Sequence, residues 1–369
     1  MKIAILREQT EGERRVAATP DTIKKYIALG ASVSIESNAG SDISVSDSDY
    51  EMAGASISNN LADADIVLCV RTPAQKTLAK IKENSILIGM LDPYSEGEKL
   101  DVYNQRKISA FSLELLPRIS RAQSMDVLSS QSNLAGYRAV IDAVATLGKA
   151  VPMMMTAAGT VAPAKVLVLG AGVAGLQAIA TAKRLGAVVS AFDVRPVAKE
   201  QVESLGAKFI EVAASESGEA SGGYAKEMSE DYKRKQSELI AETIIKQDIV
   251  ISTALIPGRP APVLITEEMV KNMKQGSVIV DLAAASGGNC PLTELDKTVV
   301  KHGVMLIGYG NLPSRVAIDA SQLYARNIYN FVSTLLIEKN DLNVKWDDEL
   351  VKGTLLTHDG VTVNATFAK

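Results

Sequence analysis

One short glycine-rich stretch constrains the fold of this chain more than any other feature. Residues 166–169 form an apolar run, and the sequence Gly170-Ala-Gly172-Val-Ala-Gly175 follows directly. A strand, a GxGxxG turn and a helix in this order are typical of the first βαβ unit of a dinucleotide-binding sheet. There Gly170 permits the tight turn, Gly172 lets the backbone approach a pyrophosphate, and Gly175 allows helix and strand to pack closely. The stretch therefore predicts a nucleotide site at the start of a helix.

An acidic residue, Asp193, lies where the next strand of such a unit ends, at a spacing typical of ribose recognition. Its carboxylate can accept hydrogen bonds from the ribose hydroxyls and would repel a 2′-phosphate, which favours NAD(H) over NADP(H). Arg195 argues the other way, since a nearby arginine can accommodate that phosphate. The alternative is an ordinary glycine-rich turn with Asp193 solvated. The predicted cofactor site comprises Gly170, Gly172, Val173, Ala174, Gly175, Asp193, Val194 and Arg195.

Apolar runs alternate with helical stretches twice along the chain, which predicts two α/β units. The strands expected in the first unit are residues 2–5, 32–36, 65–70 and 85–90, and five more follow from residue 165 onward. The long helices are expected at residues 130–147 and 317–337. We predict an α/β fold with two Rossmann-like, doubly wound parallel-sheet domains joined by long helices. The first domain comprises residues 1–130 and 317–369, and the second, residues 131–316, binds NAD(H).

Composition excludes several other classes of protein. Hydrophobic residues make up 47% and charged residues 22% of the 369 residues, which predicts a globular protein with a core. A net charge of -4 and 4% aromatic residues argue against a nucleic-acid partner. Cys69 and Cys290 form no CxxC motif, so neither a disulfide framework nor a metal site is expected. The chain also shows neither a signal peptide nor an apolar run long enough to insert into a membrane.

Residues 114–138 narrow the prediction further, because they read ELLPRISRAQSMDVLSSQSNLAGYR. This segment closely resembles the signature loop of the NAD(H)-binding component of proton-translocating (Re/Si-specific) NAD(P) transhydrogenases. The resemblance continues through MTAAGTVAPAKVLVLGAGVAGLQAIATAKRLGA, GGYAKEMS, TALIPGRPAPVLITEEMV and GGNCP, and it covers nearly the whole chain. The amino-terminal REQTEGERRVAATP also resembles alanine dehydrogenases, which look like relatives of that family.

The resemblance assigns Arg118, Gln123, Asp126 and Ser129 to the nicotinamide end of the cofactor, where they would orient the ring and its ribose. Ser124 and Met125 lie between them and are expected to contact the cofactor as well. The residues themselves agree in part, because the loop offers opposite charges and an amide that both donates and accepts. An ion pair that caps the following helix would explain the same residues.

A second loop, residues 211–231, is expected to close over the bound nucleotide, with Gly223 as a hinge and Tyr224 as a catalytic contact. Its length inside a compact domain favours a functional loop over an ordinary surface loop. Leu255 and Asn311 each follow a predicted strand, at the edge where parallel sheets bind ligands, and join the cofactor-binding prediction. The run of methionines at residues 153–155 is expected to pack in the core.

The two histidines, His302 and His358, lie late in the chain, and neither is expected to be catalytic. Alanine dehydrogenases, to which the chain is also similar, use a lysine and a histidine in the first domain. Here Arg71 stands in the lysine region and Asp92 falls near the histidine position, although Arg15 remains. A substrate proton could not be moved by an arginine. Hydride transfer between two nicotinamides needs no such group, only proximity and orientation.

Sequence and resemblance together predict a subunit that exchanges hydride between its own NAD(H) and NADP(H) on a partner component. A membrane-spanning component would couple the reaction to proton translocation. The resemblance also implies a homodimer at the cytoplasmic face of the bacterial inner membrane, held there through its partners. An alanine or other amino-acid dehydrogenase and a non-catalytic NAD-binding regulatory module remain as alternatives.

Overall fold

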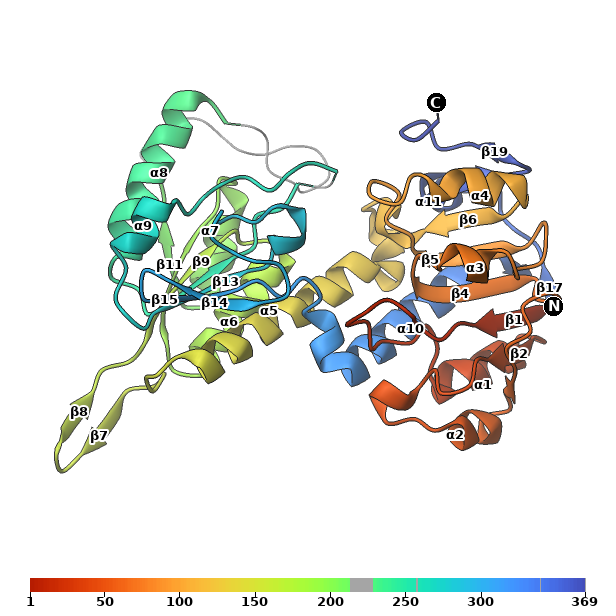
Figure 1. Ribbon diagram of the computed structural model, residues 1–369, viewed down its shortest axis with the longest axis horizontal. Helices are drawn as coiled ribbons and strands as arrows, with labels where there is room; N and C mark the ends of the chain where they lie inside the picture. Colours follow the sequence, from red (N-terminus) through yellow and green to blue (C-terminus); the bar gives the residue numbers. More distant parts are fainter. Residues whose placement is uncertain (213–227, 257, 339, 369) are drawn as a thin grey trace. The chain divides into compact units, whose positions relative to one another are not determined.

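The computed structural model describes residues 1–212, 228–256, 258–338 and 340–368 (Figure 1). The chain divides into two compact units. Unit 1 comprises Met1–Gln131 and Pro313–Lys369, and unit 2 comprises Ser132–Leu312. Each unit is built around a mainly parallel sheet, and the long helix α5 (Val127–Thr146) runs from one unit into the other. The predicted fold class, two doubly wound parallel-sheet domains with a long connecting helix, is therefore confirmed.

The sheet of unit 1 has the strand order β19-β18-β6-β5-β4-β1-β2-β3. Its strands are β1 (Lys2–Ile5), β2 (Ser32–Ile35), β3 (Ser56–Ile57), β4 (Ile66–Arg71), β5 (Ile86–Met90), β6 (Ser109–Ser112), β18 (Leu355–His358) and β19 (Val361–Thr362). The first six are parallel, whereas β18 pairs antiparallel with β6 and with β19. The order reverses between β1 and β4, which is the switch point where such sheets bind ligands.

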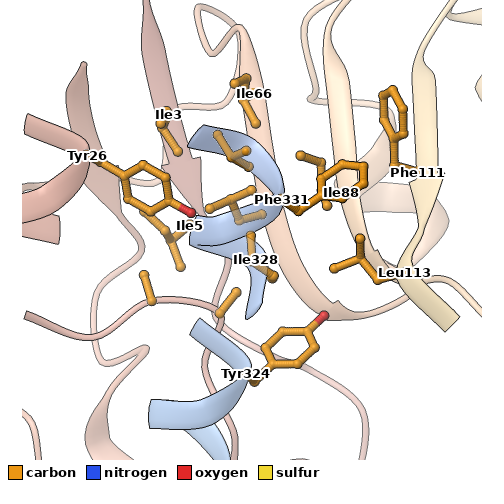
Figure 2. Close-up of a cluster of buried hydrophobic side chains, with 14 of the residues drawn as sticks. Ile3, Ile5, Tyr26, Ile66, Ile88, Phe111, Leu113, Tyr324, Ile328 and Phe331 are labelled. Carbon is orange, nitrogen blue, oxygen red and sulfur yellow. The ribbon is translucent and has the colours of Figure 1, made fainter. Parts of the chain in front are cut away.

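The returning segment supplies the helix at the centre of the unit 1 core. Helix α10 (Ala317–Leu335) presents Tyr324, Ile328 and Phe331, all with 0% exposure, to side chains from β1, β4, β5 and β6. Figure 2 shows this cluster, in which Phe331 lies near Phe111; the two rings meet edge to face at 5.7 Å between centroids. Burial of this helix explains why residues distant in sequence fold as one unit. The other helices of unit 1 are α1 (Pro20–Ala28), α2 (Asp47–Met52), α3 (Gln75–Leu78), α4 (Lys99–Gln105) and α11 (Glu349–Thr354).

The sheet of unit 2 has the order β11-β10-β9-β12-β13-β15-β14. Its strands are β9 (Lys165–Leu169), β10 (Val188–Phe192), β11 (Lys208–Ile210), β12 (Ile249–Ser252), β13 (Val278–Asp281), β14 (Thr298–Lys301) and β15 (Val304–Ile307). The five strands expected from the sequence are present and parallel, while β11 and the antiparallel β14 extend the two edges. The helices of this unit are α6 (Val173–Arg184), α7 (Val197–Ser204), α8 (Glu230–Ile244) and α9 (Glu267–Lys271).

The prediction that the methionine run packs in the core is wrong. The run belongs to a hairpin of β7 (Met154–Thr156) and β8 (Gly159–Val161), which reaches away from the sheet of unit 2 (Figure 1). Met153 is 60%, Met154 42% and Met155 80% exposed. A two-stranded ribbon has no second layer, so both of its faces meet solvent, whatever the polarity of its residues.

Unit 1 fills its own switch point with charged side chains. The side chains of Glu13 and Arg15 are 0% and 1% exposed, and Arg15 donates from Nε and Nη2 to the two carboxylate oxygens at 2.8 and 2.7 Å. Arg15 Nη1 also donates to Gln131 at 2.8 Å, and Arg71 Nε donates to Glu13 at 3.2 Å. Burial raises the pKa of Glu13, but the hydrogen bonds and charges of Arg15 and Arg71 outweigh it and lower that pKa to about 2.

Glu8, beside this ion pair, has the opposite tendency. Its carboxylate accepts the N–H groups of Val70 and Arg71 at the end of β4, at 2.6 and 3.2 Å. Burial is the largest influence and, with the nearby charge of Glu13, outweighs these bonds to raise the pKa of Glu8 to about 7. A folded-state pKa above the ordinary value means that the folded protein holds this proton longer than the unfolded chain. The stability of unit 1 should therefore fall as pH rises from about 4.5 towards 7.

We predict that Glu8→Gln makes unit 1 less sensitive to pH. Relative to the unmodified protein, the variant should gain roughly 2 kcal/mol of unfolding free energy between pH 5 and pH 8, because glutamine accepts the same N–H groups without a charge. Urea unfolding followed by tryptophan fluorescence measures this directly, because the single tryptophan, Trp346, lies in unit 1. Glu51→Gln, at an exposed glutamate of the same unit, is the matched control. Parallel pH profiles for the Glu8 variant and the unmodified protein would contradict the prediction.

Candidate nucleotide site

The glycine turn between β9 and α6 has the geometry that a dinucleotide site requires. Gly170 adopts φ +95°, in the left-handed region that favours glycine. A Cβ on Gly175 would come within 1.8 Å of the Gly170 carbonyl oxygen, so only glycine lets helix α6 pack this closely on β9. A Cβ on Gly172 would meet no protein atom within 4 Å. The backbone at Gly172 therefore lies open for a ligand to approach.

The amino-terminus of α6 is prepared for an anion. Gly172 is its N-cap and offers no side-chain cap, and the first turn carries no acidic residue. The N–H groups of Val173, which is 42% exposed, and of the half-buried Ala174 belong to this first turn, where an α-helix leaves its N–H groups unpaired. Together with the positive end of the helix dipole, they would bind a pyrophosphate. The turn lies at the switch point of unit 2, between β9 and β12.

Helix α1, at the equivalent position of unit 1, is different. The Thr19 N–H donates to Thr22 Oγ1 at 2.9 Å, Pro20 has no N–H to offer, and Asp21 places a negative charge in the first turn. These features satisfy or repel what an anion would need. Of the two switch points, only that of unit 2 suits a phosphate.

The predicted ribose acid is already paired in this structure. Asp193 Oδ2 accepts the Ala171 N–H at 2.7 Å, and Oδ1 accepts the Arg195 N–H at 2.8 Å. The Arg195 guanidinium donates to the same carboxylate from Nε at 2.9 Å and from Nη2 at 2.8 Å. The side chains of Asp193 and Arg195 are 6% and 17% exposed, and Val194 between them is half-buried. In the sequence the two charges are rival signals, whereas the fold joins them as one ion pair.

The loop assigned to the nicotinamide end lies in unit 1 and includes a 3-10 helix (Ser120–Met125). Asp126 caps helix α5, accepting from the N–H and the hydroxyl of Ser129 at 2.9 and 2.5 Å. This cap explains why the helix begins at Val127 and not at the expected residue 130.

The remaining loop residues divide by exposure. Arg118, Gln123 and Ser124 are exposed, whereas the Met125 side chain is 3% exposed and packs in the unit 1 core. The carbonyl of Ser124 accepts from Asn327 and Asn330 of α10 at 2.8 and 2.9 Å, which fixes the loop backbone. The exposed side chains are therefore carried on a well-anchored segment.

Other predicted residues lie near strand ends of unit 2. Leu255 follows β12 and is 44% exposed, and Asn311 follows β15 and is half-buried. Gly223 and Tyr224 lie outside the described residues, as does most of the predicted lid at 211–231. Its lid role therefore stays a prediction.

Two residues that sequence reasoning missed shape the glycine turn. A Cβ on Gly136 would come within 2.0 Å of the Ala174 carbonyl oxygen, so this glycine lets α5 lie against the first turn of α6. Thr253, directly after β12, donates from Oγ1 to the carbonyl of Gly170 at 3.0 Å. Neither residue could be identified from spacing alone, because each acts on a backbone group far away in the sequence.

Asn289, in the GGNCP motif, is a third such residue and is 0% exposed. Its amide donates to the carbonyls of Ala254 and Pro262 at 2.9 and 2.8 Å, and its side-chain oxygen accepts from Ser252 at 2.6 Å. It thus holds both ends of the loop that carries Leu255. A buried asparagine with its side chain satisfied in this way positions the loop rather than reacting.

Groups able to transfer protons are few in the described structure. His302 contacts Glu267 at 2.8 Å, and His358 contacts Ser109 at 2.9 Å and packs on Trp346. These contacts are structural, as expected for both histidines. Within the described ranges, no three His, Cys, Asp or Glu residues gather as metal ligands would. Nor does any helix in that part of the chain have both the length and the apolar character needed to span a bilayer.

Comparison with known proteins agrees with this geometry. Residues 4–135 match the alanine dehydrogenase/PNT N-terminal domain, and residues 139–365 match the alanine dehydrogenase/PNT C-terminal domain. The chain is 54% identical to the first of the chains that make up NAD(P) transhydrogenase subunit alpha in Rhodospirillum rubrum, covering 99% of this chain and 98% of that one. It is 31% identical to alanine dehydrogenase 2 of Staphylococcus aureus, over 86% and 82% of the two chains.

A solved structure supports the same assignment. The transhydrogenase from Sinorhizobium meliloti superposes with a TM-score of 0.88 at 46% identity, covering 99% of this chain and 100% of that one. Both domain models match in the order that the family requires, and together they cover most of the chain. The chain therefore belongs to the alanine dehydrogenase/PNT family, within its group of NAD(P) transhydrogenase alpha subunits.

Proposed function

We propose that this chain binds NAD(H) at the glycine turn of unit 2 and exchanges hydride directly with NADP(H) held by a partner component. The observation that carries the proposal is the uncapped start of α6 beside the open backbone of Gly172. Asp193 adds a carboxylate at the end of the neighbouring strand β10, where a ribose would be recognised. The names of the similar proteins support the same reaction.

The residues present fit this cofactor and this chemistry. Bound NAD(H) would supply a hydride donor or acceptor at C4 of its nicotinamide, and that step moves no substrate proton. The task of the protein is then to bind and orient, which accounts for a site without an acid–base pair. In the proposal, the start of α6 holds the pyrophosphate, and Leu255 and Asn311 line the nucleotide beyond it.

Orientation of the reacting end is assigned to the loop in unit 1. Arg118 and Gln123 offer exposed polar groups on an anchored backbone, and Ser129 and Asp126 hold each other at the start of α5. We include Tyr224 of the lid in the same role, on the resemblance alone. The family relationship, rather than a measured geometry, links this loop to the cofactor.

The partners follow from the reaction. One nicotinamide nucleotide per chain calls for a second, NADP(H)-binding component, and proton translocation calls for a membrane-spanning one. The name of the Rhodospirillum rubrum relative, a subunit, supports such an assembly. We place the chain at the cytoplasmic face of the bacterial inner membrane, as a homodimer. The exposed methionine hairpin of unit 2 supports self-association, because apolar side chains at this exposure favour a protein interface.

Two other functions predict different behaviour. An amino-acid dehydrogenase would reduce pyruvate with NADH and ammonia, but in unit 1 both Arg15 and Arg71 pair with Glu13. A regulatory NAD-binding module would bind the nucleotide without transferring hydride. An assay with alanine, pyruvate and NAD(H) tests the first alternative, and reconstituted transhydrogenation tests the second.

The loop is expected to act on rate more than on binding. Arg118→Ala, Gln123→Asn and Asp126→Asn should each slow hydride transfer, by up to on the order of a hundredfold, because small displacements of the reacting end are costly. Asparagine can still cap α5, so Asp126→Asn keeps the helix start. Stopped-flow transfer rates and NADH dissociation constants should be measured on the same samples.

The matched control is Arg121→Ala, at an arginine of the same loop that pairs with Asp348 and Glu349. It should leave the transfer rate nearly unchanged. Weaker NADH binding that fully accounts for the slower transfer would show that the loop only binds.

Transfer should depend on a partner. The purified chain alone should show no appreciable hydride transfer from NADPH to an NAD analogue. Adding a soluble NADP(H)-binding component should start transfer without a membrane, because the hydride step needs only the two nucleotide sites. Proton movement should require the membrane component as well. Robust NADPH-to-NAD transfer by this chain alone, free of contaminants, would overturn the division of labour.

A further inference from the structure

The Asp193 carboxylate has no acceptor position left in this structure. A carboxylate offers about four lone-pair positions, two on each oxygen. Oδ1 accepts the backbone N–H and the Nε of Arg195, while Oδ2 accepts the Ala171 N–H and the Nη2 of Arg195. Each oxygen therefore holds one backbone donor and one guanidinium donor.

These two kinds of donor differ in what can move. The Ala171 N–H belongs to the glycine turn, and the Arg195 N–H follows directly from β10, so both stay in place with the fold. The guanidinium is on a flexible side chain and can rotate away. Its departure would free one position on each carboxylate oxygen. Two freed positions on adjacent oxygens match the two hydroxyls of a ribose.

We propose that Arg195 is a specificity-determining residue, whose guanidinium occupies the Asp193 positions that ribose hydroxyls need and thereby weakens discrimination between NADH and NADPH. This inference rests on the proposed binding of NAD(H) in unit 2. NADH must displace the guanidinium before its ribose can bind Asp193. A displaced guanidinium is also a bidentate partner for a phosphate, so the 2′-phosphate of NADPH meets a cation as well as a carboxylate.

Charge explains the effect on discrimination. An unpaired carboxylate repels a 2′-phosphate and accepts ribose hydroxyls, so it favours NADH twice over. The Asp193–Arg195 pair is nearly neutral and partly buried, with side chains 6% and 17% exposed. It therefore repels a phosphate less than Asp193 alone would.

The test is a comparison of dissociation constants for NADH and NADPH on the full chain, followed by the fluorescence of the reduced nicotinamide. Arg195→Gln should raise the ratio of the NADPH to the NADH constant by about tenfold or more, the size expected for one charge-assisted contact. Its affinity for NADH should equal or exceed that of the unmodified protein. Arg195→Lys, which keeps the charge without the bidentate geometry, should give an intermediate ratio.

Removal of the acid should have the opposite effect. Asp193→Ala leaves the guanidinium without its carboxylate and should lower the ratio below that of the unmodified protein. Adding Arg195→Gln to it should abolish the effect of the alanine substitution on NADPH. Arg184→Gln, at an exposed arginine at the far end of α6, is the matched control and should leave the ratio unchanged.

The outcomes separate this inference from the function on which it rests. If the unmodified protein binds neither nucleotide, the proposed cofactor site is wrong and the role of Arg195 with it. If it binds NADH but Arg195→Gln leaves the ratio unchanged or lowers it, only the role of Arg195 is wrong. A large loss of NADH affinity in both Arg195 variants would show that Arg195 holds NADH directly, and would also overturn the inference.

Discussion

The close contact between helix α6 and strand β9 is the constraint on which unit 2 depends. The Gly175 backbone lies so near the Gly170 carbonyl that a methyl group would overlap it at 1.8 Å. This approach places the start of α6 at the switch point of the sheet, with its N–H groups directed outward from an uncapped first turn. Gly136 extends the same principle to α5, which lies against the Ala174 carbonyl. Three glycines at two contacts thus decide where a phosphate can bind.

The two units use one strand order for different purposes. In each sheet the first strand lies next to the fourth, and the order reverses between them. Unit 2 leaves that point open with glycines, whereas unit 1 fills it with Glu8, Glu13 and Arg15. Buried carboxylates cannot accept a phosphate, and a capped α1 with Asp21 in its first turn offers no free N–H groups. Topology alone therefore does not make a nucleotide site; the side chains at the switch point decide it.

Several polar residues hold the backbone of the candidate site and are themselves fully satisfied. Asn289 fastens the loop after β12, Thr253 holds the turn at Gly170, and Asp126 caps α5. Each of these contacts fixes a backbone whose exposed groups remain available to a ligand. Orientation, which is what direct hydride transfer requires of a protein, depends on such fixed backbones.

Local sequence determined much of this protein. The buried strands, the glycine turn and the returning helix α10 could be predicted, because hydrophobic period and glycine spacing act within a few residues. Partners distant in sequence could not. The tertiary structure alone decided that Arg195 pairs with Asp193, that Gly136 meets Ala174, and that the methionines at 153–155 lie on an uncovered hairpin. An apolar residue is buried only if another layer covers it, and a charge is available only if no neighbour has taken its hydrogen bonds. Both conditions depend on which segments the fold brings together, and no local pattern records them.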